Sequence, residues 1–169
     1  NAAIDWIRAR DSRGPWMATV SFTAAHTPVQ PPPASLRASP LAGEAFDCSS
    51  SAAQHPLTGQ MIEALDKEFG RLLVETGLAR SLSDGSLQYD PKATRTTIVI
   101  VGDNGSFPGA VRAPFDPQRA KSTAYQSGVW VPLIVAGPQV VQPGRDVEAM
   151  VTPVDLFRLS GDMAGGDTV

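Results

Sequence analysis

The sequence has little of several features that mark particular classes of protein. It holds a single cysteine, Cys48, which excludes an internal disulfide framework and a cysteine-rich zinc site. No run of apolar residues approaches the ~20 that a membrane-spanning helix needs. Charged residues make up only 18% of the chain, the net charge is −3, and there is no long basic run. A nucleic-acid or anionic-membrane partner is therefore disfavoured.

The composition that is present suits a folded protein with many loops. The chain has 169 residues, of which 42% are hydrophobic. A chain of this length forms one domain as a rule and buries about 70% of the surface that it exposes when unfolded. Glycine and proline contribute 15 residues each, which predicts many turns. Because the first residue is Asn1 and a helical pattern follows at once, we expect the sequence to be part of a longer one.

Three segments carry the signals of helices. A short helix is expected over residues 2–10, and the clearest lies at residues 58–76, where Thr58 can cap the start and Gly77 can end the helix. The third begins at Thr152, which precedes proline and then an acidic residue at the capping-box spacing. The apolar side chains of the second helix recur at the spacing of one helical face: Ile62, Leu65, Phe69, Leu72 and Leu73.

Three other segments are rich in apolar and β-branched residues and predict buried strands. They cover residues 16–22, 96–101 and 129–136, and a proline-rich loop is expected over residues 29–56. Strands that alternate with helices predict an α/β layered fold, with a mixed or mostly parallel sheet flanked by helices. Three strands are few beside the ~5–6 of a typical sheet, so we expect this sheet to be incomplete.

Chemically useful side chains follow two of these strands. In open α/β sheets ligands bind at the carboxyl ends of strands, where His26 and the pair Asp103 and Asn104 are expected here. Carboxylate and amide oxygens are ligands that Ca²⁺ or Mg²⁺ prefers. Taken singly, each residue also has an ordinary interpretation: Asp-Asn-Gly as a tight turn, His26 as a packing histidine, Lys121 as a solvated lysine and Cys48 as an inert loop thiol.

Five segments, taken together and in order, resemble the sulfatase family of the alkaline phosphatase superfamily. They are a strand with His-Thr-Pro, a helix, a strand with Asp-Asn-Gly, a block with Lys, Tyr, Gly and Val-Pro, and the start of another helix. In this sequence they occupy residues 19–30, 61–73, 97–105, 121–138 and 155–157. The resemblance spans most of the chain and implies the alkaline phosphatase-like fold.

The resemblance implies roles for four residues. Asp103 and Asn104 match calcium ligands of the family, and His26 and Lys121 match residues that contact the sulfate or the leaving-group oxygen. A divalent cation and positively charged donors suit a sulfate ester that gains negative charge as it reacts. His26 can also donate a proton to the leaving alkoxide. Calcium is the implied cofactor, and a small-molecule or saccharide sulfate ester is the implied substrate.

Other parts of the family pattern do not occur in this sequence. The family carries an acidic pair of calcium ligands and a nucleophile in Cys-x-Pro-Ser-Arg, whose cysteine becomes formylglycine, before the His-Thr-Pro segment. Cys48 precedes three serines and lies after His26, so we do not assign it as the nucleophile. Ca²⁺ takes ~6–8 oxygen ligands, of which Asp103 and Asn104 supply about three at most.

These observations lead to one functional hypothesis and two alternatives. We expect residues 1–169 to be a partial sulfatase-like catalytic domain without the N-terminal portion that bears the nucleophile, and to be inactive alone. The remainder of its own catalytic domain is then the expected partner. One alternative is a phosphodiesterase or phosphonate monoester hydrolase of the same superfamily; the other is a non-catalytic, degenerate α/β domain. No targeting segment is recognisable, and the resemblance alone implies a periplasmic or secreted protein.

Overall fold

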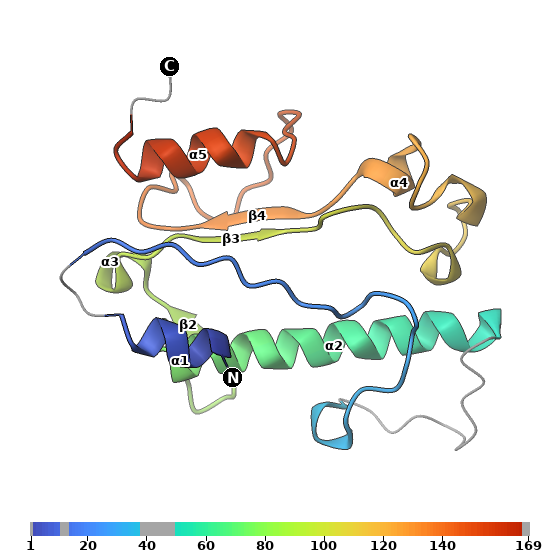
Figure 1. Cartoon of the computed structure of the whole chain (residues 1–169), viewed down its shortest axis with the longest axis horizontal. Coiled ribbons are helices and arrows are strands. Elements are labelled where there is room, and N and C mark those ends of the chain that lie inside the picture. Colours follow the sequence, from blue (N-terminus) through green and yellow to red (C-terminus); the bar gives the residue numbers. More distant parts are fainter. Residues whose placement is uncertain (1, 11–13, 38–49, 167–169) are drawn as a thin grey trace.

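The chain folds into helices and two short antiparallel strand pairs, a small α/β arrangement (Figure 1). The computed structural model describes residues 2–10, 14–37 and 50–166. No helix in these ranges is both long and apolar enough to cross a bilayer. In chain order the elements are α1 (Ala2–Arg8), η1 (Ala34–Leu36), α2 (Ser51–Glu75), β1 (Ala79–Ser81), β2 (Leu87–Tyr89), α3 (Pro91–Thr94), β3 (Ile98–Val101), η2 (Pro108–Ala110), η3 (Pro117–Arg119), α4 (Gln126–Val129), β4 (Leu133–Ala136) and α5 (Asp155–Met163).

Helix α2 is longer than predicted, because its cap lies further upstream. The Ser50 hydroxyl accepts a hydrogen bond from the backbone N–H of Ala53 at 3.2 Å, so the helix starts at Ser51 and includes Pro56. The predicted cap, Thr58, lies inside the helix and donates instead to the carbonyl of Gln54 at 2.7 Å. The predicted end is confirmed: Gly77 has a φ of +75°, the left-handed conformation that terminates a helix.

The predicted apolar stripe of α2 is confirmed in its second half, where Leu72 and Leu73 are buried and Phe69 packs against them. The first half differs: its buried apolar residues are Leu57, Met61 and Ala64, which follow one another at spacings of four and three. Ile62, which the sequence places among the core residues, is 54% exposed. Because α2 starts at Ser51, its first turns pack against Val29 and the residues around it, and these contacts bury Leu57 and Met61 instead of Ile62.

Strands β3 and β4 form a two-stranded antiparallel ribbon. Ile98 pairs with Ala136 and Val101 with Leu133, and the N–H of Gly102 donates to the carbonyl of Pro132 at 3.0 Å. β1 and β2 are also antiparallel, so the described residues contain no parallel pair and the expected mostly parallel sheet is not seen in them. The chain between β3 and β4 reverses through loops and short helices and so returns antiparallel, whereas a parallel pair needs a crossover connection.

The first predicted strand is absent from residues 16–22. Residues 14–22 are extended and exposed, and no backbone hydrogen bond within the described ranges involves them. A strand exists only where a neighbour accepts and donates its backbone hydrogen bonds, and this segment has no such neighbour among the described residues. The apolar pattern predicted the extended backbone, but its predicted burial is wrong.

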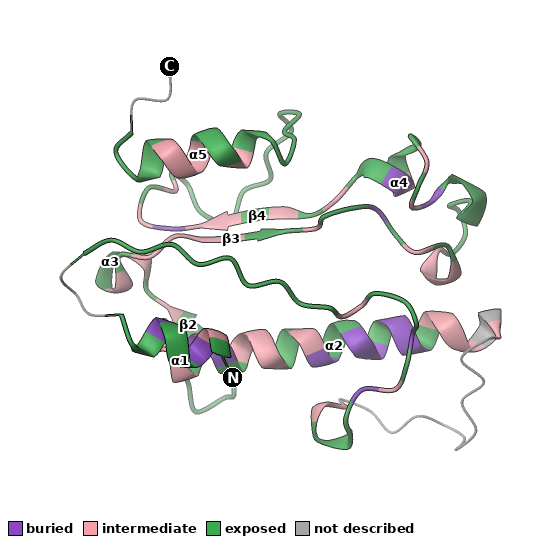
Figure 2. Ribbon diagram, viewed as in Figure 1, coloured by how far each residue is buried: buried purple, intermediate pink, exposed green. Residues whose placement is uncertain are grey.

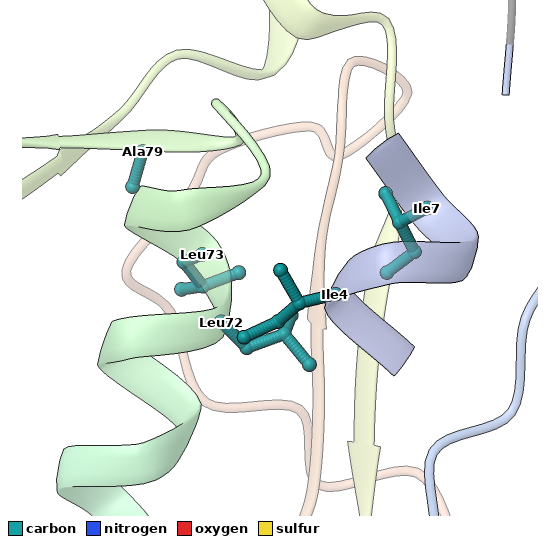
Figure 3. Close-up of a cluster of buried hydrophobic side chains, with 5 residues drawn as sticks. All are labelled: Ile4, Ile7, Leu72, Leu73 and Ala79. Carbon is teal, nitrogen blue, oxygen red and sulfur yellow. The ribbon is translucent and has the colours of Figure 1, made fainter. Parts of the chain in front are cut away.

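Two separate apolar clusters hold the elements together (Figure 2). The first joins α1, α2 and β1, and Figure 3 shows Ile4 between Leu72 and Ile7. Ile98 of β3 and Tyr89 of β2 pack against it. The second cluster consists of Val29, Leu57 and Met61, with Ala24, Ala25, Ala53 and Phe107 packed around it. This second cluster positions the segment before His26 and the loop after β3 on the same part of α2.

The molecule exposes more surface than a compact protein of its mass. Its accessible surface is 12348 Å², whereas a compact monomer of 17.8 kDa exposes about 8,000 Å². An unfolded chain of this mass exposes about 26,000 Å², so folding buries about half of that area and not the expected ~70%. The two clusters are small and the ribbon and α5 lie to one side of them, which leaves much apolar surface in water.

Candidate active site

Backbone hydrogen bonds join the turn after β3 to the loop before β4. The N–H of Gly105 donates to the carbonyl of Gly128 at 3.0 Å, and the N–H of Ser106 donates to the carbonyl of Ser127 at 2.9 Å. The N–H of Lys121 donates in turn to the carbonyl of Ser106 at 2.9 Å. The Asp-Asn-Gly turn and Lys121 are therefore held in one small region, although about 17 residues of chain separate them.

Two glycines make this close approach possible. A Cβ on Gly105 would lie 2.3 Å from the carbonyl oxygen of Ser127, and a Cβ on Gly128 would lie 2.3 Å from the carbonyl oxygen of Thr123. Both obstacles are backbone atoms, which cannot rotate away as a flexible side chain can. Gly128 lies in the block of residues 121–138 that resembles the sulfatase family, but its packing role could not be predicted, because a glycine in a loop indicates a turn as readily as a close contact.

His26 lies opposite Lys121 and is oriented by its own backbone. The N–H of His26 donates to the carbonyl of Thr23 at 2.8 Å, and the ring Nδ1 lies 2.7 Å from the carbonyl of Thr27. A carbonyl oxygen only accepts, so we assign the ring proton to Nδ1. The Nε2 of His26 then presents a lone pair, and the Nζ of Lys121 lies 3.4 Å from it and can donate to it.

The lysine of this pair places a positive charge at an accessible point beside the histidine ring. His26 is exposed and Lys121 is half-buried, and in the described part of the chain Lys121 forms no ion pair with a carboxylate. Two residues before it, the guanidinium of Arg119 stacks on Tyr125 at 4.6 Å from the ring centre and lies 3.6 Å from a carboxylate oxygen of Asp116. An anionic group of a ligand can therefore reach an ammonium that is not held in an ion pair by any described carboxylate.

Asp103 and Asn104 have the right donor chemistry for a hard cation but are too few. Both are exposed, and the Asn104 amide donates through Nδ2 to the carbonyl of Gly105 at 3.0 Å, which leaves its Oδ1 as an acceptor. Two such residues supply about three oxygens, whereas Ca²⁺ takes ~6–8. The described ranges hold no group of three or more His, Cys, Asp or Glu residues that could bind a metal ion. These residues alone do not complete a calcium site.

The other histidine and the cysteine lie outside this arrangement. The ring Nδ1 of His55 lies 2.8 Å from the carbonyl of Ala110 and so ties α2 to η2, which supports the loop that carries the Asp-Asn-Gly turn. Cys48 lies outside the described residues. Of the residues that the sequence offered for the site, the structure brings Lys121 close to His26 and to the Asp-Asn-Gly turn, and its hydrogen bonds and two glycines hold them there.

The fold and the site together define a small α/β protein whose loops gather a histidine, a lysine and a turn of oxygen donors. A sulfatase of Formosa agariphila is similar to it, with 29% identity over 168 residues, which are 98% of this chain and 29% of that protein. The steryl-sulfatase of Rattus norvegicus is 25% identical over 113 residues, which are 67% of this chain and 19% of that protein. The steryl-sulfatase of Mus musculus is 30% identical over 122 residues, which are 68% of this chain and 19% of that protein.

These similarities show that the chain is related to the sulfatase family. The chain spans less than a third of the length of the relatives that it matches. No protein-family model and no solved structure matches it.

Proposed function

We propose that residues 1–169 carry the latter part of the catalytic domain of a hydrolase that cleaves sulfate esters. The observation that carries this proposal is the approach of Lys121 Nζ to within 3.4 Å of His26 Nε2, beside the Asp-Asn-Gly turn. The two residues are 95 positions apart and meet at a solvent-accessible point, and in the described part of the chain no carboxylate forms an ion pair with the lysine. This arrangement suits recognition of an anionic group. The family relationship supports sulfate as that group.

The roles of the two residues follow from their charges. Hydrolysis of a sulfate ester breaks a bond between sulfur and oxygen, and negative charge develops on the leaving oxygen. The ammonium of Lys121 can hold an oxygen of the sulfate as this charge develops, which typically accelerates such a reaction by about 10²–10³-fold per donor. His26, when protonated at Nε2, can give that proton to the leaving oxygen.

Asp103 and Asn104 are proposed as two ligands of a calcium ion whose other ligands lie outside these residues. When bound, the ion would supply positive charge beside the sulfate. The nucleophile of the proposed reaction, the formylglycine of the family, is likewise expected outside these residues. The isolated chain is therefore expected to be inactive, and turnover of a sulfate ester by the isolated chain that requires a metal and is lost in Asp103→Ala would contradict this view.

A chimera tests the proposed activity directly. In the Formosa agariphila sulfatase, the matched 29% of the length is replaced by this chain, and hydrolysis of an aryl sulfate and of the matching aryl phosphate is measured. We expect turnover of the sulfate, with losses of about 10²–10³-fold in kcat for Lys121→Met and for His26→Gln. Thr27→Ser, which keeps the carbonyl that orients His26, is the matched control and should retain activity.

Two results would reject the proposed roles. A chimera in which Lys121→Met keeps its activity within about threefold would remove the lysine from the chemistry. Preferred turnover of the aryl phosphate would favour a phosphodiesterase or phosphonate monoester hydrolase instead. Circular dichroism of each variant, compared with the unmodified chimera, separates loss of chemistry from loss of folding.

A further inference from the structure

An arginine stacked on a tyrosine lies beside Lys121 and has no part in the reaction proposed above. The guanidinium carbon of Arg119 lies 4.6 Å from the centre of the Tyr125 ring, which is a cation–π contact. The Arg119 side chain is 58% exposed and Tyr125 is 53% exposed. The two residues come two positions before and four positions after Lys121, so a second cation and an aromatic ring accompany the lysine at the surface.

Hydrogen bonds fix the backbone that carries Arg119. The Ser127 hydroxyl donates to the carbonyl of Arg119 at 2.8 Å, and the Thr123 hydroxyl donates to the carbonyl of Ala120 at 2.7 Å. Gly128 packs so closely that a Cβ there would lie 2.6 Å from the same Ala120 carbonyl oxygen. A backbone held in this way loses little further freedom when a ligand binds, which favours binding.

The backbone at Ala120 directs Arg119 and Lys121 to the same side of the segment. Ala120 is extended, with φ −88° and ψ −154°, and it is 1% exposed. Side chains of an extended chain alternate, so both neighbours of this inward residue point outward, and their Cα atoms lie roughly 7 Å apart. On that side the Nζ of Lys121 lies 3.4 Å from the Nε2 of His26, so Arg119 is placed next to the candidate active site.

Arg119 keeps most of its capacity to bind an anion. Among the described residues it forms one ion pair, in which its Nε lies 3.6 Å from a carboxylate oxygen of Asp116, and both side chains are exposed. A pair of this length in water holds its charges weakly. Stacking on Tyr125 occupies a face of the guanidinium plane, whereas the N–H groups lie along its edge. That edge fits two oxygens of a sulfate or a carboxylate.

An apolar surface continues from Tyr125 along α4. Val129 follows Tyr125 by four residues, and its N–H donates to the Tyr125 carbonyl at 3.1 Å. Residues at this spacing share one face of a helix, and Val129 is 60% exposed. An aromatic ring with an aliphatic neighbour suits the flat face of a sugar or aryl ring, while polar groups at its rim fix the orientation of that ring.

We propose that Arg119 is a specificity-determining residue, which binds a second anionic group of the substrate whose sulfate ester lies at Lys121. Tyr125 is the positioning residue that holds the guanidinium in place. The substrate class is then a sulfate ester that carries a further sulfate or carboxylate, in preference to a simple monosulfate. This inference rests on the proposed function, because it takes Lys121 as the residue that holds the reacting sulfate.

Matched substitutions separate recognition by Arg119 from general attraction of charge. Arg119→Gln removes the guanidinium, and Tyr125→Ala removes the ring that holds it, whereas Tyr125→Phe keeps a ring for stacking. Arg158→Gln removes an equal charge elsewhere and is the control. Arg158 is 75% exposed, its Nε lies 3.8 Å from a carboxylate oxygen of Asp162, and its helix α5 lies away from α4 in Figure 1.

The first experiment titrates the chain with two probes that contain no ester bond. Benzenesulfonate carries one anionic group and meta-benzenedisulfonate carries two, and backbone amide chemical shifts report their binding. We expect the disulfonate to bind about 10-fold or more tightly than the monosulfonate. This preference should fall below about threefold in Arg119→Gln and Tyr125→Ala and persist in Tyr125→Phe and Arg158→Gln.

The chimera described above measures the same preference in turnover. Its substrates are a nitrophenyl sulfate and the same ester with a carboxylate on the ring. We expect Arg119→Gln to lower kcat/KM for the carboxylated ester by about 10-fold or more, mainly through KM. The simple ester should keep its kcat/KM within about threefold, because Arg119 touches only the second anionic group. Circular dichroism checks that each variant is folded.

The contrary outcomes identify which proposal fails. An equal loss of the disulfonate preference in Arg119→Gln and Arg158→Gln would overturn this inference, as would a disulfonate that binds neither the chain nor the chimera. An active chimera that does not prefer the carboxylated ester rejects this inference alone. A folded chimera that hydrolyses no sulfate ester, while its binding of the disulfonate depends on Arg119, rejects the proposed function alone.

Discussion

At the scale of single residues, the site depends on two close backbone contacts, one at Gly105 and one at Gly128, that no functional side chain makes. Gly105 and Gly128 allow two loops to approach until backbone atoms touch, and the hydrogen bonds of Lys121 and Ser106 follow from that approach. His26 and Lys121 match site residues of the family that the sequence resembles, and the structure places the Nζ of Lys121 3.4 Å from the Nε2 of His26. The need for glycine at both positions arises only in the tertiary structure, which brings the backbones of the two loops into contact.

The first residue-scale prediction concerns Gly128. Gly128→Ala would place a methyl group 2.3 Å from the carbonyl oxygen of Thr123, so the loop must move and the free energy of unfolding should fall by about 2 kcal/mol or more. Gly59→Ala is the matched control: no atom lies within 4 Å of its added Cβ, and alanine should stabilise α2 by about 0.5–1 kcal/mol. Urea denaturation of both variants measures the two changes, and an equal response would contradict the predicted clash.

At the scale of elements, local sequence patterns predicted the helix α2 and the strand β3, but tertiary contacts set their ends and the pairing of the strands. The sequence predicted a helix around residues 58–76, yet its start moved to Ser51 because the hydroxyl of Ser50 caps the earlier turn. The strand predicted at 96–101 is present as β3, although its last two residues are exposed and not buried. Of the strand predicted at 129–136, only Leu133–Ala136 forms β4, and its first residue, Val129, ends α4. Apolar runs mark where extended chain occurs, whereas the direction of pairing depends on the connection between strands.

One side chain links these elements, and its removal is an element-scale prediction. The hydroxyl of Tyr89 in β2 donates to the carbonyl of Thr96 and lies 3.4 Å from that of Ala136 in β4, and burial raises the pKa of this phenol. Tyr89→Phe leaves these carbonyls without their donor and should lower the free energy of unfolding by about 1–2 kcal/mol.

The control for Tyr89 is Tyr125, which is exposed and whose hydroxyl makes no hydrogen bond within the described ranges. Tyr125→Phe should change the free energy of unfolding by less than about 0.5 kcal/mol. Thermal unfolding followed by circular dichroism compares the two variants. If Tyr125→Phe lowered the free energy of unfolding as much as Tyr89→Phe, the Tyr89 hydrogen bonds would not be what joins the β1–β2 pair to the β3–β4 ribbon.

At the scale of the whole molecule, the exposed area is the property that departs most from expectation. The length predicted a domain that buries about 70% of its unfolded surface, and the structure buries about half. The chain matches relatives of which it spans 29% or less, and its apolar segment at residues 16–22 has no backbone partner in the described ranges.

The whole-molecule prediction concerns the denaturant dependence of unfolding. The slope m is proportional to the surface that unfolding exposes, so the isolated chain should show about three quarters of the m value of a compact protein of 169 residues. Urea titration followed by tryptophan fluorescence gives the slope. A radius of gyration of about 15–16 Å from X-ray scattering, together with the m value of a compact protein of this length, would contradict the prediction and show a more compact structure in solution.

The sequence by itself determined the local features: the apolar periodicity of α2, the glycine that ends it, the extended backbone of 16–22 and 98–101, and the residue types of the site. These follow from the conformational preferences and chemistry of neighbouring residues. Only the tertiary structure decided which face of α2 is buried, that β3 and β4 pair antiparallel, and that His26 meets Lys121. Those outcomes depend on contacts between residues far apart in the chain, which pattern and propensity do not encode.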